Sequence, residues 1–207
     1  MSSDTQRRNL WLAIAAVALG QAAVLGYMIW DRVSLLSNGR EVVLEVIPVD
    51  PRSLFRGDYV ILSYELSRVE LPAGTEPPKR GTDYYVVVQK APEPAAADPA
   101  APNVAAPSAN WKVVGGGPEL PKELKPDQVA IKGRVEYTSR ATKETPATVD
   151  VHYGIESFFV PEGTGRELEK MVGDRKLSAI IAVGDSGKPA IKGLLSEGRR
   201  VYEEPLL

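Results

Sequence analysis

The amino-acid sequence predicts a mainly β domain joined to one N-terminal transmembrane helix, and three observations support this fold class. The segment Leu10 to Trp30 is almost wholly apolar, and its length is enough to cross a hydrocarbon core of about 30 Å as a helix. Beyond it, short runs rich in Val, Ile and Tyr alternate with turn residues, as strands do in β proteins. The 207 residues include 18 glycines and 17 prolines, which indicates many loops between short strands.

The composition excludes several classes of function. A formal net charge of -2 gives no reason to expect a nucleic-acid partner. The chain has no cysteine, which excludes disulfides, thiolate metal sites and cysteine nucleophiles. Its single histidine, His152, excludes a multi-histidine metal site. We therefore expect no metal and no other cofactor.

The residues around the apolar segment predict how the chain sits in a membrane. Residues 1–9 form a polar tail in which Arg7 and Arg8 directly precede the apolar segment. Positively charged flanks stay in the cytoplasm, so residues after Asp31 are expected on the outer side. Trp11 and Trp30 lie near the two ends, as in an interfacial aromatic belt. We expect a single-pass protein of the cytoplasmic (inner) membrane, with the lipid bilayer as a partner and a periplasmic or extracytoplasmic domain.

Two alternatives for the apolar segment are a cleaved signal peptide and a buried core helix. Ala18-Leu19-Gly20 loosely fits the small-x-small cleavage rule, and the Arg7-Arg8 pair also occurs in twin-arginine signals. However, the apolar run continues past Gly20 to Trp30, which favours an uncleaved anchor at residues 10–30. A core helix needs a polar face, and this segment has none.

The remainder of the chain predicts a connector, residues 31–40, and a β-rich domain, residues 41–207. Alternation and β-branched content predict strands at residues 41–49, 58–69, 84–89, 111–114, 129–137, 147–153, 177–183, 190–195 and 198–203. The first two are expected to pair antiparallel. A short helix is expected at residues 166–172, and Gly133 is expected to mark a bulge.

The segment 91–109 differs in kind from the rest of the domain. It consists mostly of alanine and proline and offers almost nothing to bury. Such a composition predicts an extended surface insertion within a hairpin. The alternative is a polyproline motif that docks a partner.

Residues 55–64 are the most distinctive stretch of the chain. Gly57-Asp58 is typical of a tight turn, and a strand is expected from Tyr59 onward. Alternation places Leu62 and Tyr64, with Asp58, Val60 and Leu66, on the face expected to enter the core.

Five of these residues carry a family resemblance. Gly57, Asp58, Tyr59, Leu62 and Tyr64 resemble the signature of the GDYXXLXY family, bacterial membrane-anchored proteins of unknown activity. Residues 153–163 also look like a second block typical of that family. The resemblance implies a membrane anchor, but it carries over no catalytic residue, and the insertion at 91–109 departs from it.

A short repeat suggests two related β-rich halves that share one core. Ala130-Ile131-Lys132-Gly133 recurs as Ala190-Ile191-Lys192-Gly193, with strands and turns in a corresponding order around each copy. The alternative is that two strands end in the same four residues by chance.

The sequence allows two catalytic interpretations. Residues 51–60 resemble the segment of signal peptidases that follows their nucleophilic serine, but none of the four residues directly before Pro51 is a serine. Ser53 lies after the proline, and Lys90 is a generic later lysine, so no paired base is evident. Carboxylates of Asp58, Glu156 and Glu162 could form a hydrolytic pair, although Gly57-Asp58 is explained by turn formation alone. A lone strand histidine such as His152 is more often packed or exposed than a pH switch.

We therefore predict a membrane-anchored, extracytoplasmic binding or accessory module of the cell envelope, with other envelope membrane proteins as partners. Its candidate recognition patch is Arg56, Asp58, Tyr59, Glu156 and Glu162. The alternative is a membrane-tethered hydrolase with a carboxylate site. A deep pocket converging on Arg56 and these carboxylates would favour the hydrolase.

Overall fold

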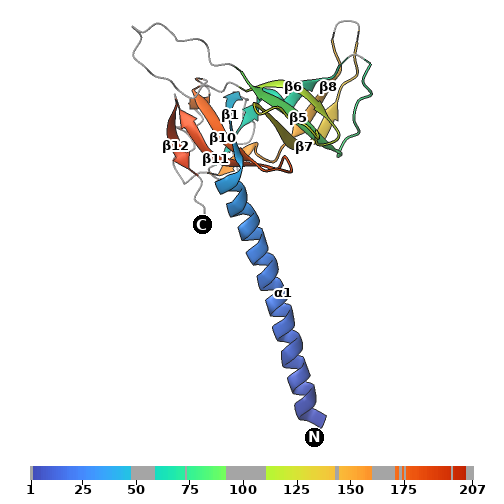
Figure 1. Ribbon diagram of the computed structural model, residues 1–207, viewed down its shortest axis with the longest axis vertical. Coiled ribbons are helices and arrows are strands. Elements are labelled where there is room, and N and C mark those ends of the chain that lie inside the picture. The colour runs from blue at the N-terminus through green and yellow to red at the C-terminus, as the bar shows by residue number, and fades with distance from the viewer. Residues whose placement is uncertain are drawn as a thin grey trace.

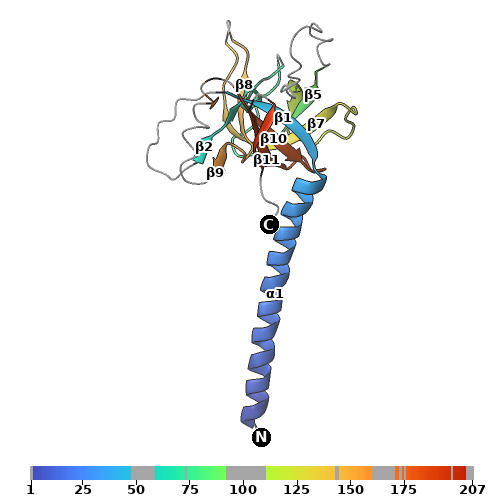
Figure 2. The ribbon, with the colours of Figure 1, turned by 90° about the vertical axis from the view of Figure 1, so that its left-hand side faces the viewer.

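One long helix projects from a β-rich body (Figures 1 and 2). The computed structural model describes residues 2–47, 59–72, 74–91, 111–142, 145–159, 171–172, 174, 176–196 and 198–203. The fold class expected from the sequence is confirmed by this arrangement. The predicted insertion from residue 92 onward, the Gly57-Asp58 turn and most of the predicted helix at 166–172 lie outside the described residues.

Helix α1, Ser2–Asn38, is long and apolar enough to cross a membrane. Its apolar segment contacts no part of the β body, and large side chains such as Leu25 and Trp30 are exposed. Residues 31–38, expected to be a connector, instead continue the helix. The helix ends where the N–H of Gly39 donates to the carbonyl of Leu35 at 2.9 Å.

Three kinds of contact attach the end of α1, and the residues just after it, to the body. Leu36, only 1% exposed, and Leu35 pack in a small apolar cluster with Ala182 and Ala190. The ammonium of Lys188 lies 2.6 Å from the carboxylate of Asp31. Just beyond the helix, the guanidinium of Arg40 donates to the carbonyl oxygens of Pro126 and Gln128. The exposed apolar part of the helix therefore leads directly into the folded body.

The first of two five-stranded antiparallel sheets has the order β12-β11-β10-β1-β3. Its strands are β1 Arg40–Ile47, β3 Ser63–Tyr64, β10 Leu177–Val183, β11 Pro189–Ser196 and β12 Arg199–Glu203. β10 pairs with β1 on one side and with β11 on the other, which confirms the hairpin expected after residue 177. Its burial is nearly complete along its whole length, as expected of a central strand.

The second sheet has the order β4-β8-β7-β5-β6. Its strands are β4 Arg68–Glu70, β5 Asp83–Lys90, β6 Trp111–Gly117, β7 Gln128–Thr138 and β8 Thr148–His152. β5 pairs with β6, which confirms the hairpin expected around the insertion, and β7 pairs with β8. In β5 buried residues alternate with partly exposed ones, so one face of this strand lines the core.

The sequence predicts one strand over residues 58–69. This prediction was wrong, because the stretch is divided into several elements. It forms β2 Tyr59–Ile61, β3, the 3-10 turn η1 Glu65–Ser67 and β4. β2 pairs with β9, Ser157–Phe159, in a separate two-stranded sheet, while β3 pairs with β1 and β4 with β8. The chain turns at η1 because it passes from one five-stranded sheet to the other. This stretch therefore supplies a strand to every sheet of the domain.

A single large apolar core lies between the sheets. Leu62 is fully buried, and Tyr64 and Leu66 are 2% and 3% exposed, which confirms the predicted core face at these positions. They pack in one cluster with Leu44 of the first sheet and Val86 of the second. Complete burial of a leucine or valine side chain contributes roughly 1.5–3 kcal/mol to the free energy of unfolding.

The two copies of the Ala-Ile-Lys-Gly repeat occupy comparable strands, β7 and β11. In both copies the alanine, isoleucine and glycine are buried and the lysine is partly exposed. Lys132 pairs with Asp83 at 2.7 Å and Lys192 with Glu41 at 2.8 Å. The first strand of each proposed half also joins the other half's sheet, since β1 pairs with β10 and β8 with β7. The duplication stays a hypothesis that these correspondences support.

Gly133 does not mark the bulge that the sequence suggested. The shift in register between β7 and β8 falls between Val135 and Tyr137. A Cβ on Gly133 would instead meet the side chain of Val151 and lie 2.9 Å from the carbonyl oxygen of His152. Close approach of the neighbouring strand is therefore the reason for glycine at this position.

Candidate functional site

The two sequence blocks of the resemblance lie side by side. β2 pairs with β9 in the register Tyr59 to Phe159, and beyond it the N–H of Leu62 donates to the carbonyl of Glu156 at 2.8 Å. Of the predicted recognition patch, the structure describes the backbone of Tyr59 and the whole of Glu156. Arg56, Asp58, Glu162 and the motif's Gly57 lie outside the described residues, so the patch stays a prediction.

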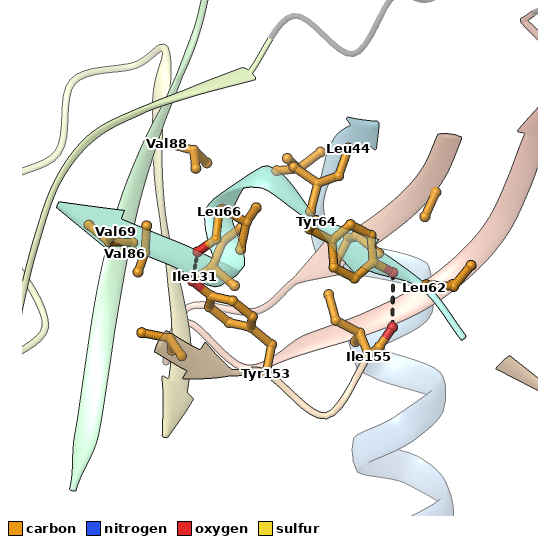
Figure 3. Packing of buried hydrophobic residues seen from close by; sticks show 14 of the residues in the cluster. Leu44, Leu62, Tyr64, Leu66, Val69, Val86, Val88, Ile131, Tyr153 and Ile155 are labelled. Atoms are coloured by element: carbon orange, nitrogen blue, oxygen red, sulfur yellow. Dashed lines mark hydrogen bonds between the residues drawn. The ribbon is translucent and has the colours of Figure 1, made fainter. Parts of the chain in front are cut away.

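Two buried tyrosines link these blocks by reciprocal hydrogen bonds (Figure 3). The hydroxyl of Tyr64 donates to the carbonyl of Ile155 at 2.9 Å, and that of Tyr153 donates to the carbonyl of Leu66 at 2.7 Å. Burial, and secondarily the nearby Glu156 carboxylate, raises the pKa of both phenols well above the usual value. Both therefore stay neutral donors, and their role is to join the segments.

Glu156 closes the turn that carries the second block. Its carboxylate accepts hydrogen bonds from the N–H groups of Tyr153 and Gly154, at 2.6 and 2.8 Å. Gly154 has φ +78°, a left-handed conformation that favours glycine. The same carboxylate lies 3.2 Å from Nε2 of His152. Glu156 is thus engaged in holding the turn, which argues for a structural role and against a free general base.

A hollow of about 560 Å³ adjoins this turn. It is lined by Ser63, Glu65, Arg68, Glu136, Asp150, His152 and Glu156, with some apolar residues beneath. Arg68 and Asp150 pair across it at 2.8 Å. Within the described part of the chain, no three histidine, aspartate or glutamate side chains are grouped to hold a metal ion. The hollow is therefore a surface of paired charges at the edge of the motif.

A larger cavity, about 680 Å³, lies between the two edge strands of the second sheet, β4 and β6. β4 and β6 are at opposite ends of the strand order, yet residues of both line this cavity. The sheet thus curls until its ends face each other, and β1 and η1 of the neighbouring segment line the gap. Side chains of the apolar core reach the cavity from the inside: Leu44, Tyr64, Leu66, Val69, Tyr84 and Val88.

Sequence reasoning missed this cavity. The strand at Trp111 was expected, but the curl that brings β6 toward β4 depends on long-range pairing, which a local pattern does not reveal. A local signal was present in Gly115-Gly116-Gly117, which lies beyond the predicted strand 111–114 and forms the end of β6. A Cβ on Gly116 would lie 2.7 Å from the ring of Tyr84, so glycine lets this ring lie against the strand.

Comparison with known families identifies one match. The model of a family described as "GDYXXLXY protein" matches residues 21–194, which is most of the chain. Neither the comparison with curated proteins nor the comparison with solved structures gave a match. The match begins within the apolar segment and includes both sequence blocks that the tyrosines join.

Proposed function

This chain belongs to the GDYXXLXY family, and we propose that it is a membrane-anchored binding or accessory module of the cell envelope, with its β domain on the extracytoplasmic side. One observation carries the proposal. The apolar segment of α1 is wholly exposed, yet its last turns are packed into the β body. A helix that needs lipid on one part and the domain on the other is suited to hold that domain at a membrane surface.

The packing of α1 also supports an uncleaved anchor. Removal of the chain up to Gly20 would leave exposed Val24, Leu25, Tyr27 and Trp30 on a body that still holds Leu36. Such an apolar stub in water favours aggregation. Retention in the bilayer gives these side chains the environment they require. Arg7 and Arg8 favour a cytoplasmic N-terminus, which places the domain outside.

A binding role is supported by the surface of the domain. The cavity between β4 and β6 is concave, apolar at its base and charged at its rim, which is the usual arrangement of a recognition site. The hydrolase alternative depends on Asp58, Glu162 and Arg56, which are outside the described residues, and on Glu156, whose oxygens already hold a turn. No observation favours it.

Topology and partner capture test the proposal together. Reporter enzymes that are active only outside, or only inside, the cytoplasm are fused to the C-terminus of the full chain. We expect activity of the outside reporter alone; activity of the inside reporter, or release of the protein from membranes, contradicts the anchor. Cross-linking in intact membranes, with Arg56, Asp58 and Tyr59 replaced in parallel, then tests binding. If neither the unsubstituted protein nor any variant gives a specific cross-linked protein, the proposed binding function is overturned.

A further inference from the structure

The free edge of β6 faces the cavity with few of the features that protect the other sheet edges. Among the described strands, β6 pairs with β5 only. The end strand β12 carries exposed Arg199, Arg200 and Glu203, and β4 carries Arg68 and Glu70. β6 has Lys112 followed by exposed Val113 and Val114 and then three glycines. Unpaired, uncharged strand edges are templates for pairing with another chain.

A cavity of about 680 Å³ lies beside β6. The cavity is bordered by β6 on one side and by β4, η1 and β1 on the other. Partly buried Trp111 and exposed Val113 and Val114 also line it, so a chain lying in it would add apolar contacts to hydrogen bonds with the β6 backbone. Extended peptides bind sheet edges in this way, with alternate side chains entering pockets.

The charges around the cavity indicate which kind of strand fits it. Exposed carboxylates of Glu45, Glu65 and Glu70 line it, against the cations Arg68 and Lys112. Arg68 is already neutralised by Asp150 at 2.8 Å. The rim is therefore acidic, which favours basic residues in the occupant and disfavours acidic ones.

We propose that this cavity binds an extended, basic segment of a partner envelope protein, which adds to β6 as a further strand. This inference rests on the proposed binding function and specifies its site and the chemistry of its partner. The partner's backbone amides pair with β6, its apolar side chains lie over Trp111 and Val113, and its lysine or arginine residues lie against Glu45 and Glu70.

Peptide binding to the full-length protein in lipid nanodiscs tests the proposal. The probe is acetyl-Lys-Thr-Val-Thr-Val-Thr-Lys-amide, and the control is the same peptide with both lysines replaced by glutamate. Trp111 lines the cavity, so its fluorescence reports binding once Trp11 and Trp30 in α1 are changed to phenylalanine. We expect saturable binding of the basic peptide and at least about tenfold weaker binding of the acidic one.

Two further comparisons separate strand addition from charge attraction. Methylation of alternate amide nitrogens removes the donors along one edge of the peptide and keeps every side chain. We expect methylation along one edge to abolish binding and methylation along the other to be tolerated. Replacement of Glu45, Glu65 and Glu70 together by glutamine should weaken binding about fivefold or more at low salt, whereas Glu136→Gln, outside this cavity, should not.

Each outcome decides the matter. Absence of saturable binding, equal binding of the basic and acidic peptides, or equal effects of methylation on both edges would overturn this inference. If the membrane cross-linking above still captured a specific protein through another surface, the module function would stand and only this site would fall. If cross-linking captured nothing as well, both would fall.

Discussion

Tyr64 and Tyr153 each donate a hydroxyl hydrogen bond to the backbone beside the other, and together they join two sequence blocks that lie within the range matched by the family. Tyr64 follows β2 in the first block, while Tyr153 precedes the turn of the second. Both acceptors are backbone carbonyls in the interior, at Ile155 and Leu66 (Figure 3). Loss of either hydroxyl would leave a buried acceptor unpaired, which has a measurable cost.

The first prediction follows from these hydrogen bonds. Tyr64→Phe and Tyr153→Phe should each lower the free energy of unfolding by about 1–2 kcal/mol. Each substitution keeps the ring but leaves one buried carbonyl oxygen without its hydrogen-bond donor. Urea denaturation of the purified full-length protein in detergent measures the change. Tyr137→Phe is the matched control, since its side chain is 62% exposed, and it should shift stability by less than about 0.5 kcal/mol. A control as damaging as the two buried variants would refute the assignment.

Alkaline pH should weaken the fold through the same tyrosines. Burial raises the pKa of Tyr64 and Tyr153, so their stabilising contribution is complete below pH of about 10, the value of a free tyrosine. As pH rises further, the unfolded chain loses phenolic protons that the folded chain keeps. The free energy of unfolding should then fall by about 1.4 kcal/mol per pH unit for each buried phenol.

Denaturant midpoints measured across this alkaline range check the prediction. Tyr64→Phe should make the fall in stability shallower by the contribution of one phenol. An unchanged slope for Tyr64→Phe would mean that this phenol ionises as easily in the folded protein as in the unfolded chain.

Glu156 gives a third prediction. Glu156→Ala removes acceptors from the N–H groups of Tyr153 and Gly154 and should destabilise the protein by about 1–3 kcal/mol. Glu156→Gln keeps one acceptor oxygen, so its effect should be about half as large. If Glu156 were instead a general base in an otherwise stable turn, the urea midpoint of both variants would equal that of the unsubstituted protein.

The close approach of strands at Gly133 gives a fourth prediction. Gly133→Ala should cost about 1–3 kcal/mol, because the added methyl group meets Val151 and a carbonyl oxygen of β8. Gly193→Ala in the second repeat should cost a similar amount, since a Cβ there would lie 2.6 Å from the carbonyl oxygen of Tyr202. Gly117→Ala has open space around it and should change stability little. Thermal unfolding of the three variants side by side tests whether the two repeats are equivalent.

Local patterns in the sequence predicted the strands well, and they failed where distant contacts decide the structure. Period-two alternation identified β1, which has one buried face, and β-branched and aromatic content identified β5. The stretch from 58 to 69 has the same alternation, but it is divided because its residues pair with three different strands. Glu156 was singled out for chemistry, whereas its hydrogen bonds to the turn are visible only in the fold.

The cavity beside β6 shows the same limit. Trp111, Lys112 and the valines that follow were correctly predicted as a strand, but a strand's position at the end of a sheet depends on the pairing of all the others. β4 forms the opposite wall of the cavity because the chain turns at η1 just before it, and the alternation did not predict this turn.

The junction between helix and body gives the last prediction. Leu36→Ala removes a side chain that is 1% exposed from the contact with Ala182 and Ala190, and such changes cost about 2–5 kcal/mol. The end of α1 should then separate from the β10–β11 hairpin more often, and trypsin should cleave after Arg32 or Arg40 at least about 30-fold faster in nanodiscs. Leu25→Ala, in the exposed apolar part of the helix, is the control and should leave the cleavage rate unchanged. Equal cleavage of the two variants would mean that the body hangs from the membrane on a flexible link; faster cleavage of Leu36→Ala alone would establish that the helix holds the domain in one orientation at the bilayer surface.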